Sequence, residues 1–107
     1  MRVTGAMEFG RVHGRAAWDS SCPGDCLRIV IVLETRGEVR TVRDECVRVL
    51  GEGGPRDDLP WHADQYTQET IGVDLALEGW EAISQPAESE NRGSIDRATV
   101  TYVVRRL

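Results

Sequence analysis

Residues 27–34 read LRIVIVLE and form the most apolar run in the chain. Apolar and β-branched side chains follow one another here almost without the polar alternation of a half-exposed strand. The run therefore predicts a buried strand that is apolar on both faces. The chain has 107 residues, a length that suggests a single globular domain over residues 1–107, built around this strand.

Strand periodicity also marks the first and the last part of the chain. Residues 2–18, RVTGAMEFGRVHGRAAW, alternate between small or apolar and polar residues as far as Phe9. Gly10 and Gly14 interrupt this alternation, so we expect a bulge, a bend or a short hairpin there. Residues 97–106, RATVTYVVRR, carry apolar side chains at every second position and predict another strand.

The segment before that last strand also alternates. Residues 70–84, TIGVDLALEGWEAIS, have apolar side chains at alternate positions from Ile71 to Leu77 and predict a half-exposed strand. Residues 85–94, QPAESENRGS, are polar and predict a turn or loop. Because sequential strands commonly pair, we expect a hairpin between residues 70–84 and 97–106.

Residues 35–51, TRGEVRTVRDECVRVLG, fit two structures. Apolar residues recur at the spacings of one helical face, Thr35 and Glu38 fit a capping box, and Gly51 fits a helix C-cap. Against a helix, Gly37 would lie in the first turn and the valines disfavour helical conformation. The rival is a hairpin that turns at residues 35–37. We favour a helix over residues 36–50, because three independent signals agree.

Residues 51–69, GEGGPRDDLPWHADQYTQE, show little periodicity and predict a long loop. A loop of this length is usually functional, flexible, or a segment in which an element has been overlooked. Together these segments predict an α+β fold, with a small antiparallel sheet of about four strands and the helix at 36–50 across one face. A mainly-β sandwich or barrel is the alternative.

Two cysteines, Cys22 and Cys26, flank a Pro-Gly-Asp turn just before the apolar run. Zinc needs four ligands, and only Cys46, His13 and His62 could complete the set, without a second closely spaced pair. We therefore interpret the segment as a tight turn into the strand, with Cys26 at the start of the core, and predict no bound metal or cofactor. A disulfide between the two cysteines stays open as an alternative.

Charge and hydropathy narrow the classes of partner. The formal net charge is −5 and all 13 basic residues are arginine, a bias typical of GC-rich genomes that points to a bacterial or phage source. An acidic balance argues against nucleic-acid binding, which needs a clustered basic face. The sequence has no apolar run long enough to span a membrane and no signal-peptide pattern. We therefore expect a cytoplasmic protein with no membrane partner.

The chain contains two histidines. His13 lies between Gly10 and Gly14, in RVHGR, and is interpreted as an exposed residue at the end of a strand. His62 lies in LPWHADQY, where an aspartate could orient its ring and aromatic side chains could anchor a partner. The candidate binding residues are Trp61, His62, Asp64, Tyr66 and Trp80.

No motif for a nucleophile, a metalloprotease or a phosphate-binding loop occurs in the sequence. We therefore expect a non-enzymatic protein-interaction or assembly module, as an accessory, regulatory or defence-related subunit. Its partner would be another protein or a second copy in a homodimer. The alternative is a small-molecule-binding domain or small enzyme, in which His62 is the base or ligand contact and Asp64 orients it.

Overall fold

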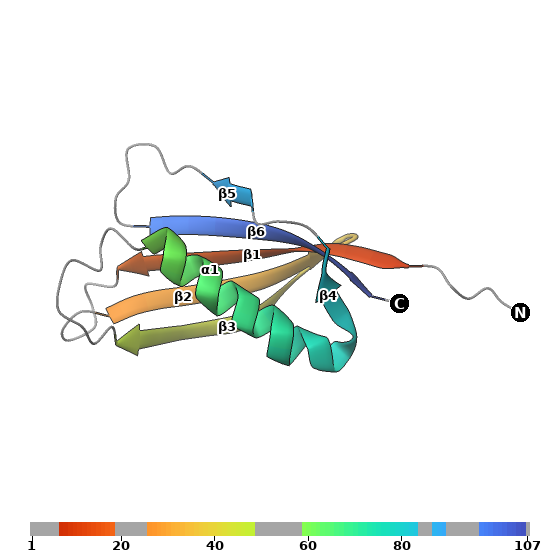
Figure 1. Cartoon of the computed structure of the whole chain (residues 1–107), viewed down its shortest axis with the longest axis horizontal. Coiled ribbons are helices and arrows are strands. Elements are labelled where there is room, and N and C mark those ends of the chain that lie inside the picture. The colour runs from red at the N-terminus through yellow and green to blue at the C-terminus, as the bar shows by residue number, and fades with distance from the viewer. Residues whose placement is uncertain (1–6, 19–25, 49–58, 84–86, 90–96, 107) are drawn as a thin grey trace, which may run out of the picture.

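A computed structural model describes residues 7–18, 26–48, 59–83, 87–89 and 97–106. Its strands form one antiparallel sheet in the order β3-β2-β1-β6-β4, and β5 also pairs with β6 (Figure 1). The helix α1 crosses one face of this sheet. The strands are β1 (Glu8–Trp18), β2 (Cys26–Thr35), β3 (Glu38–Arg48), β4 (Trp80–Ala82), β5 (Ala87–Ser89) and β6 (Arg97–Arg106), and α1 spans Leu59–Thr70.

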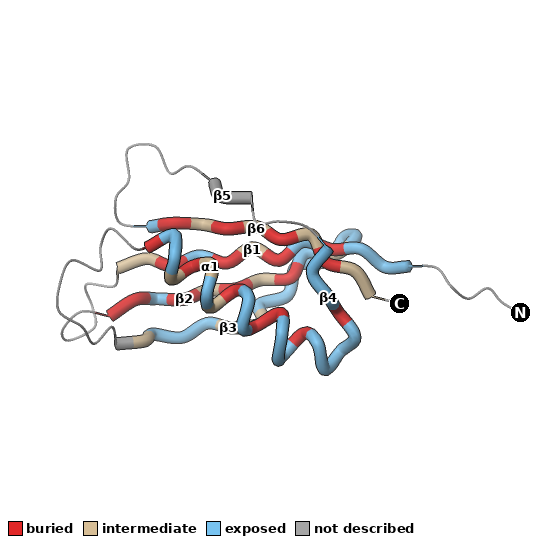
Figure 2. Tube along the Cα trace, in the orientation of Figure 1, coloured by how far each residue is buried: buried red, intermediate tan, exposed pale blue. Residues whose placement is uncertain are grey.

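The core lies between α1 and the sheet face that it covers. Alternate residues of β1, β2 and β6 are buried there, as the red segments of Figure 2 show. Their largest fully buried side chains are Leu27, Ile29, Ile31, Val12, Val100 and Val104. The α+β architecture, an antiparallel sheet with a helix on one face, is therefore confirmed.

The predicted strand at 27–34 is confirmed as β2, although only one of its faces is fully buried. Leu27, Ile29 and Ile31 face α1, whereas Val30 and Val32 are half-buried on the opposite face. The strands predicted within residues 2–18 and at 97–106 are confirmed as β1 and β6. Residues 1–6 lie outside the described part of the chain.

The glycines of β1 do not make the expected bulge or bend. β1 pairs with β2 and with β6 in continuous register from Gly10 to Ala17. Gly10 and Gly14 both point toward the buried side, where other atoms occupy the space that a side chain would need. They are required for close packing, and the strand continues through them.

The helix predicted at 36–50 is wrong, and the rival hairpin is correct. Gly37 has a φ of +79°, which a tight turn between β2 and β3 requires and which glycine adopts without steric cost. The pairing of β3 with β2 then shifts by one residue at a bulge between Thr41 and Arg43. This extra residue breaks the period of two, so the valines of a strand take on helical spacing. Residues 49–51 lie outside the described part.

The loop predicted at 51–69 is wrong for its second half, because α1 begins at Leu59. Residues 51–58 lie outside the described part. The strand predicted at 70–84 is also mostly wrong. Residues Ile71–Leu75 continue α1 as a π-helical turn and Ala76–Glu78 as a 3₁₀ turn, until Gly79 at φ 92° ends the helical segment.

Two of the four alternating apolar residues in that segment form a helical pair. Ile71 and Leu75 are buried four residues apart, while Val73 and Leu77 are exposed. A strand and one helical face can thus share this pattern over so short a stretch. Within the segment predicted as a strand, residues 80–82 form β4, which pairs with β6. The short strand β5, which also pairs with β6, lies within the predicted loop at 85–94.

Among the helices of the described residues, none is both long enough and apolar enough to cross a membrane.

Candidate functional site

The sequence of α1 divides the helix into a buried side and an outer side. Leu59, Ala63, Thr67 and Thr70 are buried, at spacings of three and four residues that keep them on one side of a helix. The helix packs with this side on β1 and β6. Trp61, Gln65, Gln68 and Glu69 are exposed on the outer side, and His62, Asp64 and Tyr66 are half-buried between the two sides.

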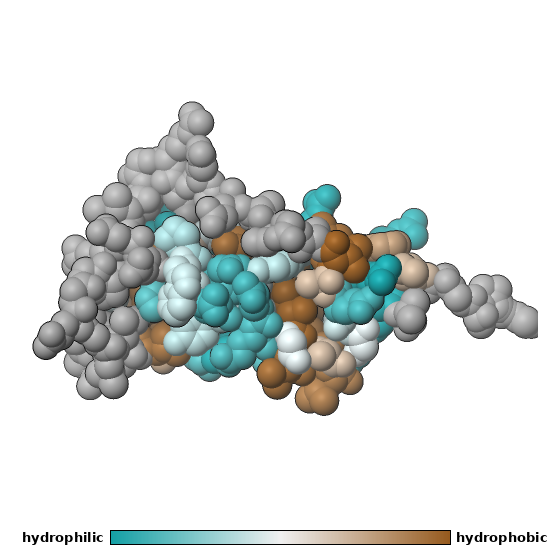
Figure 3. All heavy atoms as spheres, in the orientation of Figure 1, coloured by the Kyte–Doolittle hydropathy of each residue, from teal (hydrophilic) through white to brown (hydrophobic). Residues whose placement is uncertain are grey.

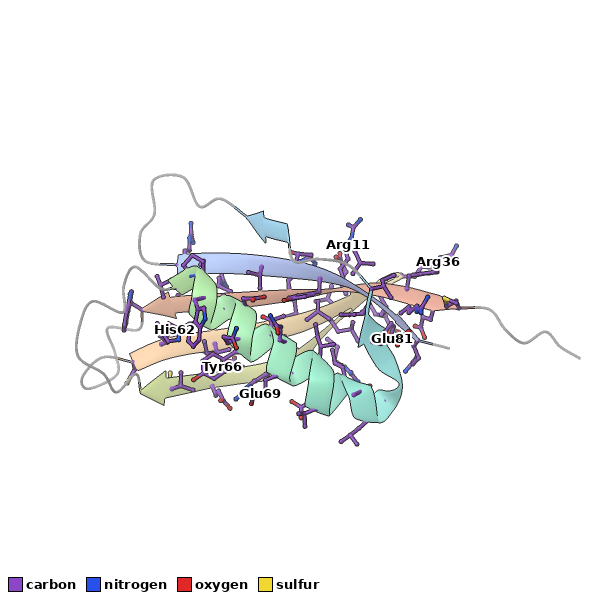
Figure 4. All side chains as sticks on the ribbon, in the orientation of Figure 1. Arg11, Arg36, His62, Tyr66, Glu69 and Glu81 are labelled. Atoms are coloured by element: carbon purple, nitrogen blue, oxygen red, sulfur yellow. The ribbon has the colours of Figure 1, made fainter. Side chains whose placement is uncertain are left out.

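The outer side of α1 carries an open hollow of about 510 Å³, which we call the α1 hollow. Trp61 is 58% exposed, and its ring meets that of His62 edge-on, with centroids 5.1 Å apart. Figure 4 shows His62, Tyr66 and Glu69 along the same helix. The hollow is lined by Trp61, His62, Gln65, Tyr66, Gln68 and Glu69.

Tyr66 and Glu69 are held in place by an arginine from the edge strand β3. The Arg43 guanidinium lies over the Tyr66 ring, 5.1 Å from its centroid, and donates to Glu69 at 3.2 Å. It also donates to Glu45 at 2.7 Å, and this hydrogen bond raises the pKa of Arg43 above its usual range. Arg43 thus fixes Tyr66 and Glu69, on the side of the α1 hollow nearest β3, to the sheet.

Asp64 does not orient His62. Residues two apart on a helix do not face each other, so the two side chains leave α1 in different directions. The Asp64 carboxylate instead accepts hydrogen bonds from the Tyr102 hydroxyl and from Gln68 Nε2, the latter at 2.7 Å. Burial, and secondly the hydrogen bond to Asp64, raises the pKa of Tyr102 to about 12.

Trp80 lies away from the α1 hollow, in the short strand β4. Its side chain is only 3% exposed, and the Arg106 guanidinium covers its ring at 4.7 Å from the centroid. Arg106 in turn donates to Glu8. Of the five candidate binding residues, Trp61, His62 and Tyr66 line one surface, Asp64 supports it from the side, and Trp80 is part of the core.

The three cysteines of the chain differ in their surroundings. Cys26 is buried at the start of β2 and is disulfide-bonded, so it offers no thiolate to a metal. Cys46 is an exposed thiol on β3. Cys22 and the turn that follows it lie outside the described residues. Within the described part, no group of three or more His, Cys, Asp or Glu side chains could hold a metal ion.

His13 is not an exposed residue at a strand end, as predicted, but a half-buried and hydrogen-bonded one. It lies in the middle of β1, on the face opposite α1, with Nδ1 at 3.0 Å from Thr101 Oγ1 and Nε2 at 2.9 Å from Glu34 Oε1. The hydrogen bond from His13, together with its charge, lowers the pKa of Glu34. Counting in steps of two along β1 would have placed this residue beside Phe9 and Arg11 on one face.

Thr101, His13 and Glu34 are hydrogen-bonded in the order of a hydrolytic triad, but they are not surrounded as a catalytic triad is. The three residues lie in β6, β1 and β2, which pair with one another, so the backbone N–H groups around them are hydrogen-bonded within the sheet. Those N–H groups cannot form the oxyanion hole that acyl transfer needs. The trio acts as a bridge that ties β1, β2 and β6 together.

The surface around α1 is mixed in character. In Figure 3 the outer side of α1 is largely polar to neutral, and apolar surface gathers further along, where the helical segment turns toward β4. The exposed apolar residues of that second region include Val73 and Leu77.

No protein-family model, no curated protein and no solved structure matches this chain.

Proposed function

We propose that this chain is a protein-interaction module that holds a partner protein against the α1 hollow. The observation that carries the proposal is the exposed Trp61 on a helix, next to the His62 and Tyr66 rings and surrounded by polar side chains. An aromatic centre with a polar rim is the usual anatomy of a protein–protein contact. Tryptophan and tyrosine are also the side chains most often found as energetic anchors.

The packing of α1 supports a role in binding. Trp61 lies on a helix whose opposite side is buried, so the backbone loses little conformational freedom when a partner covers it. Arg43 likewise holds Tyr66 and Glu69 in place before any partner arrives. By contrast, the small-molecule or enzymatic alternative needs Asp64 to act on His62, and Asp64 is engaged with Tyr102 and Gln68.

The test begins by trapping the partner. A photo-crosslinking residue is placed at position 61 in the cells that make this protein, and the same residue at position 77 serves as the reference. Leu77 is 86% exposed and apolar but lies outside the α1 hollow. We expect one protein to be trapped from position 61 and not from position 77. A second copy of this chain as the trapped protein would identify a homodimer.

Affinity for the purified partner then decides the proposal. Trp61→Ala is expected to weaken binding about 30-fold, the effect of losing a contact of about 2 kcal/mol. Leu77→Ala is expected to change it less than about 2-fold, and both variants should melt as the wild type does, because both side chains are exposed. Equal trapping at the two positions, or unchanged affinity of Trp61→Ala, would contradict the proposal.

A further inference from the structure

A second hollow, of about 810 Å³, lies at the end of the sheet where β2 turns into β3. We call it the hairpin-end hollow. Arg11 and Arg36 project at this end in Figure 4, whereas His62 lies toward the opposite end of the sheet. The hollow is lined by Met7, Glu8, Phe9, Gly10, Arg11, Glu34, Thr35, Arg36 and Val103.

The two arginines of this hollow donate no hydrogen bond within the described residues, whereas its two carboxylates are each hydrogen-bonded by another side chain. Glu34 is bound by His13 at 2.9 Å, and Glu8 accepts hydrogen bonds from Arg106. The side chains of Arg11 and Arg36 are exposed and make no hydrogen bond or ion pair with the residues that the structure describes. The hollow therefore holds two guanidinium groups whose N–H donors are available to a ligand, although Arg11 also attracts the Glu34 carboxylate electrostatically.

Apolar side chains share the same hollow. Phe9 is 54% exposed, and Met7, two residues earlier in the chain, is also exposed. Val103 lies directly opposite Arg11 in the pairing of β1 with β6 and is half-buried. A ligand that fits this surface carries an anionic group for the guanidinium groups and an apolar group for Phe9.

We propose that the hairpin-end hollow binds an extended acidic segment of a partner protein, with a carboxylate on Arg11 and Arg36 and a neighbouring apolar side chain on Phe9. Planar guanidinium groups match carboxylates through paired hydrogen bonds. A nucleic acid fits less well, because two arginines cannot neutralise a continuous row of phosphates. This inference uses none of the residues of the α1 hollow and does not depend on it.

His13 has a positioning role in this site. By binding the Glu34 carboxylate, it reduces the competition between that carboxylate and a ligand for Arg11, which stands directly opposite Glu34 in the pairing of β1 with β2. His13→Ala is therefore expected to weaken ligand binding without removing any residue that touches the ligand, and Glu34→Gln in the same chain should restore it.

The probe is a capped peptide of sequence Gly-Ser-Asp-Glu-Phe-Glu-Gly-Ser, added to the full chain labelled with ¹⁵N. We expect the backbone amide signals of Phe9, Arg11 and Arg36 to shift at a peptide concentration of about 1 mM, which detects a weak site. The same peptide with Asn and Gln in place of Asp and Glu should cause no such shifts. Absence of shifts with the acidic peptide, or equal shifts with both peptides, would overturn the proposal.

Matched arginine variants localise the effect. Arg11→Gln combined with Arg36→Gln is expected to weaken peptide binding at least about 10-fold, because charge-assisted hydrogen bonds are lost. Arg15→Gln is the control, since Arg15 is exposed on the same face of β1 but lies outside the hollow. An equal loss in Arg15→Gln, or tighter binding of an eight-nucleotide oligothymidine than of the peptide, would contradict a specific acidic-peptide site.

Discussion

At the scale of single residues, Asp64 interacts with Tyr102, which is distant in sequence, and not with its near neighbour His62. The sequence placed Asp64 beside His62, but its hydrogen bond is with a hydroxyl 38 positions away. Burial, then Asp64, raises the pKa of Tyr102 to about 12. Because this folded pKa exceeds the usual value of 10.0, the stability linked to it is fully present below pH 10 and is lost as pH rises toward 12.

Removing the hydroxyl tests this pair. Tyr102→Phe is expected to lower the free energy of unfolding by about 1–2 kcal/mol at neutral pH, because Asp64 loses a hydrogen bond to its charged form. It should also flatten the fall in stability between pH 10 and pH 12. Urea unfolding at neutral and alkaline pH measures both effects, with Tyr66→Phe as control. Identical alkaline profiles for wild type and Tyr102→Phe would show that the linkage is absent.

At the scale of elements, the position of α1 on the sheet depends on the absence of a side chain at Gly14. A Cβ added there would lie 1.7 Å from Thr67 Oγ1, which itself donates to the Ala63 carbonyl oxygen at 2.6 Å. No positive φ is involved, so Gly14 is needed for space alone. The helix can lie close to β1 only because this position has no side chain.

Alanine variants of a crowded glycine, Gly14, and an uncrowded one, Gly72, test whether the close contact with α1 matters for stability. Gly14→Ala is expected to lower the free energy of unfolding by at least about 2 kcal/mol, because α1 must move away from β1. Gly72→Ala, where a Cβ would meet nothing within 4 Å, should change it by less than about 0.5 kcal/mol or stabilise the helical segment. Denaturant unfolding compares them, and Thr67→Ala should partly rescue Gly14→Ala. Equal effects of the two glycine variants would rule out the close contact.

At the scale of the whole molecule, the sheet has a protected centre and less protected edges. β1 and β2 have a partner strand on each side, and β6 pairs with β1 on one side and with β4 and β5 on the other. β3 is paired with β2 and has no other partner strand among the described ones. Its bulge and its charged side chains are features that discourage further pairing at an edge.

Hydrogen exchange tests this arrangement. Backbone amides of β1, β2 and the middle of β6 are expected to exchange slowest, because opening them requires separation from two neighbours or from the core under α1. Amides of β3 that point away from β2 should exchange at least about 10-fold faster, as exposed edge positions do. Slower exchange in β3 than in β1 would show that its outer edge is covered, for example by a second copy.

The sequence by itself determined the central strands, because continuous or alternating apolar residues leave few other ways to bury them. It also indicated that Trp61, His62 and Tyr66 belong to one candidate surface. It did not identify β3, where a bulge gave strand residues a helical spacing. Nor did it identify α1, whose buried side has one large apolar residue, Leu59, and otherwise an alanine and two threonines.

Only the tertiary structure decided which residues meet across the sheet. Arg11 and Arg36 share a hollow because β1 pairs with β2 next to the turn, and His13 meets Glu34 and Thr101 because three strands align. Such contacts depend on register and on the side of the sheet that α1 covers. Local periodicity carries neither quantity, because both are set by the packing of residues far apart in the chain.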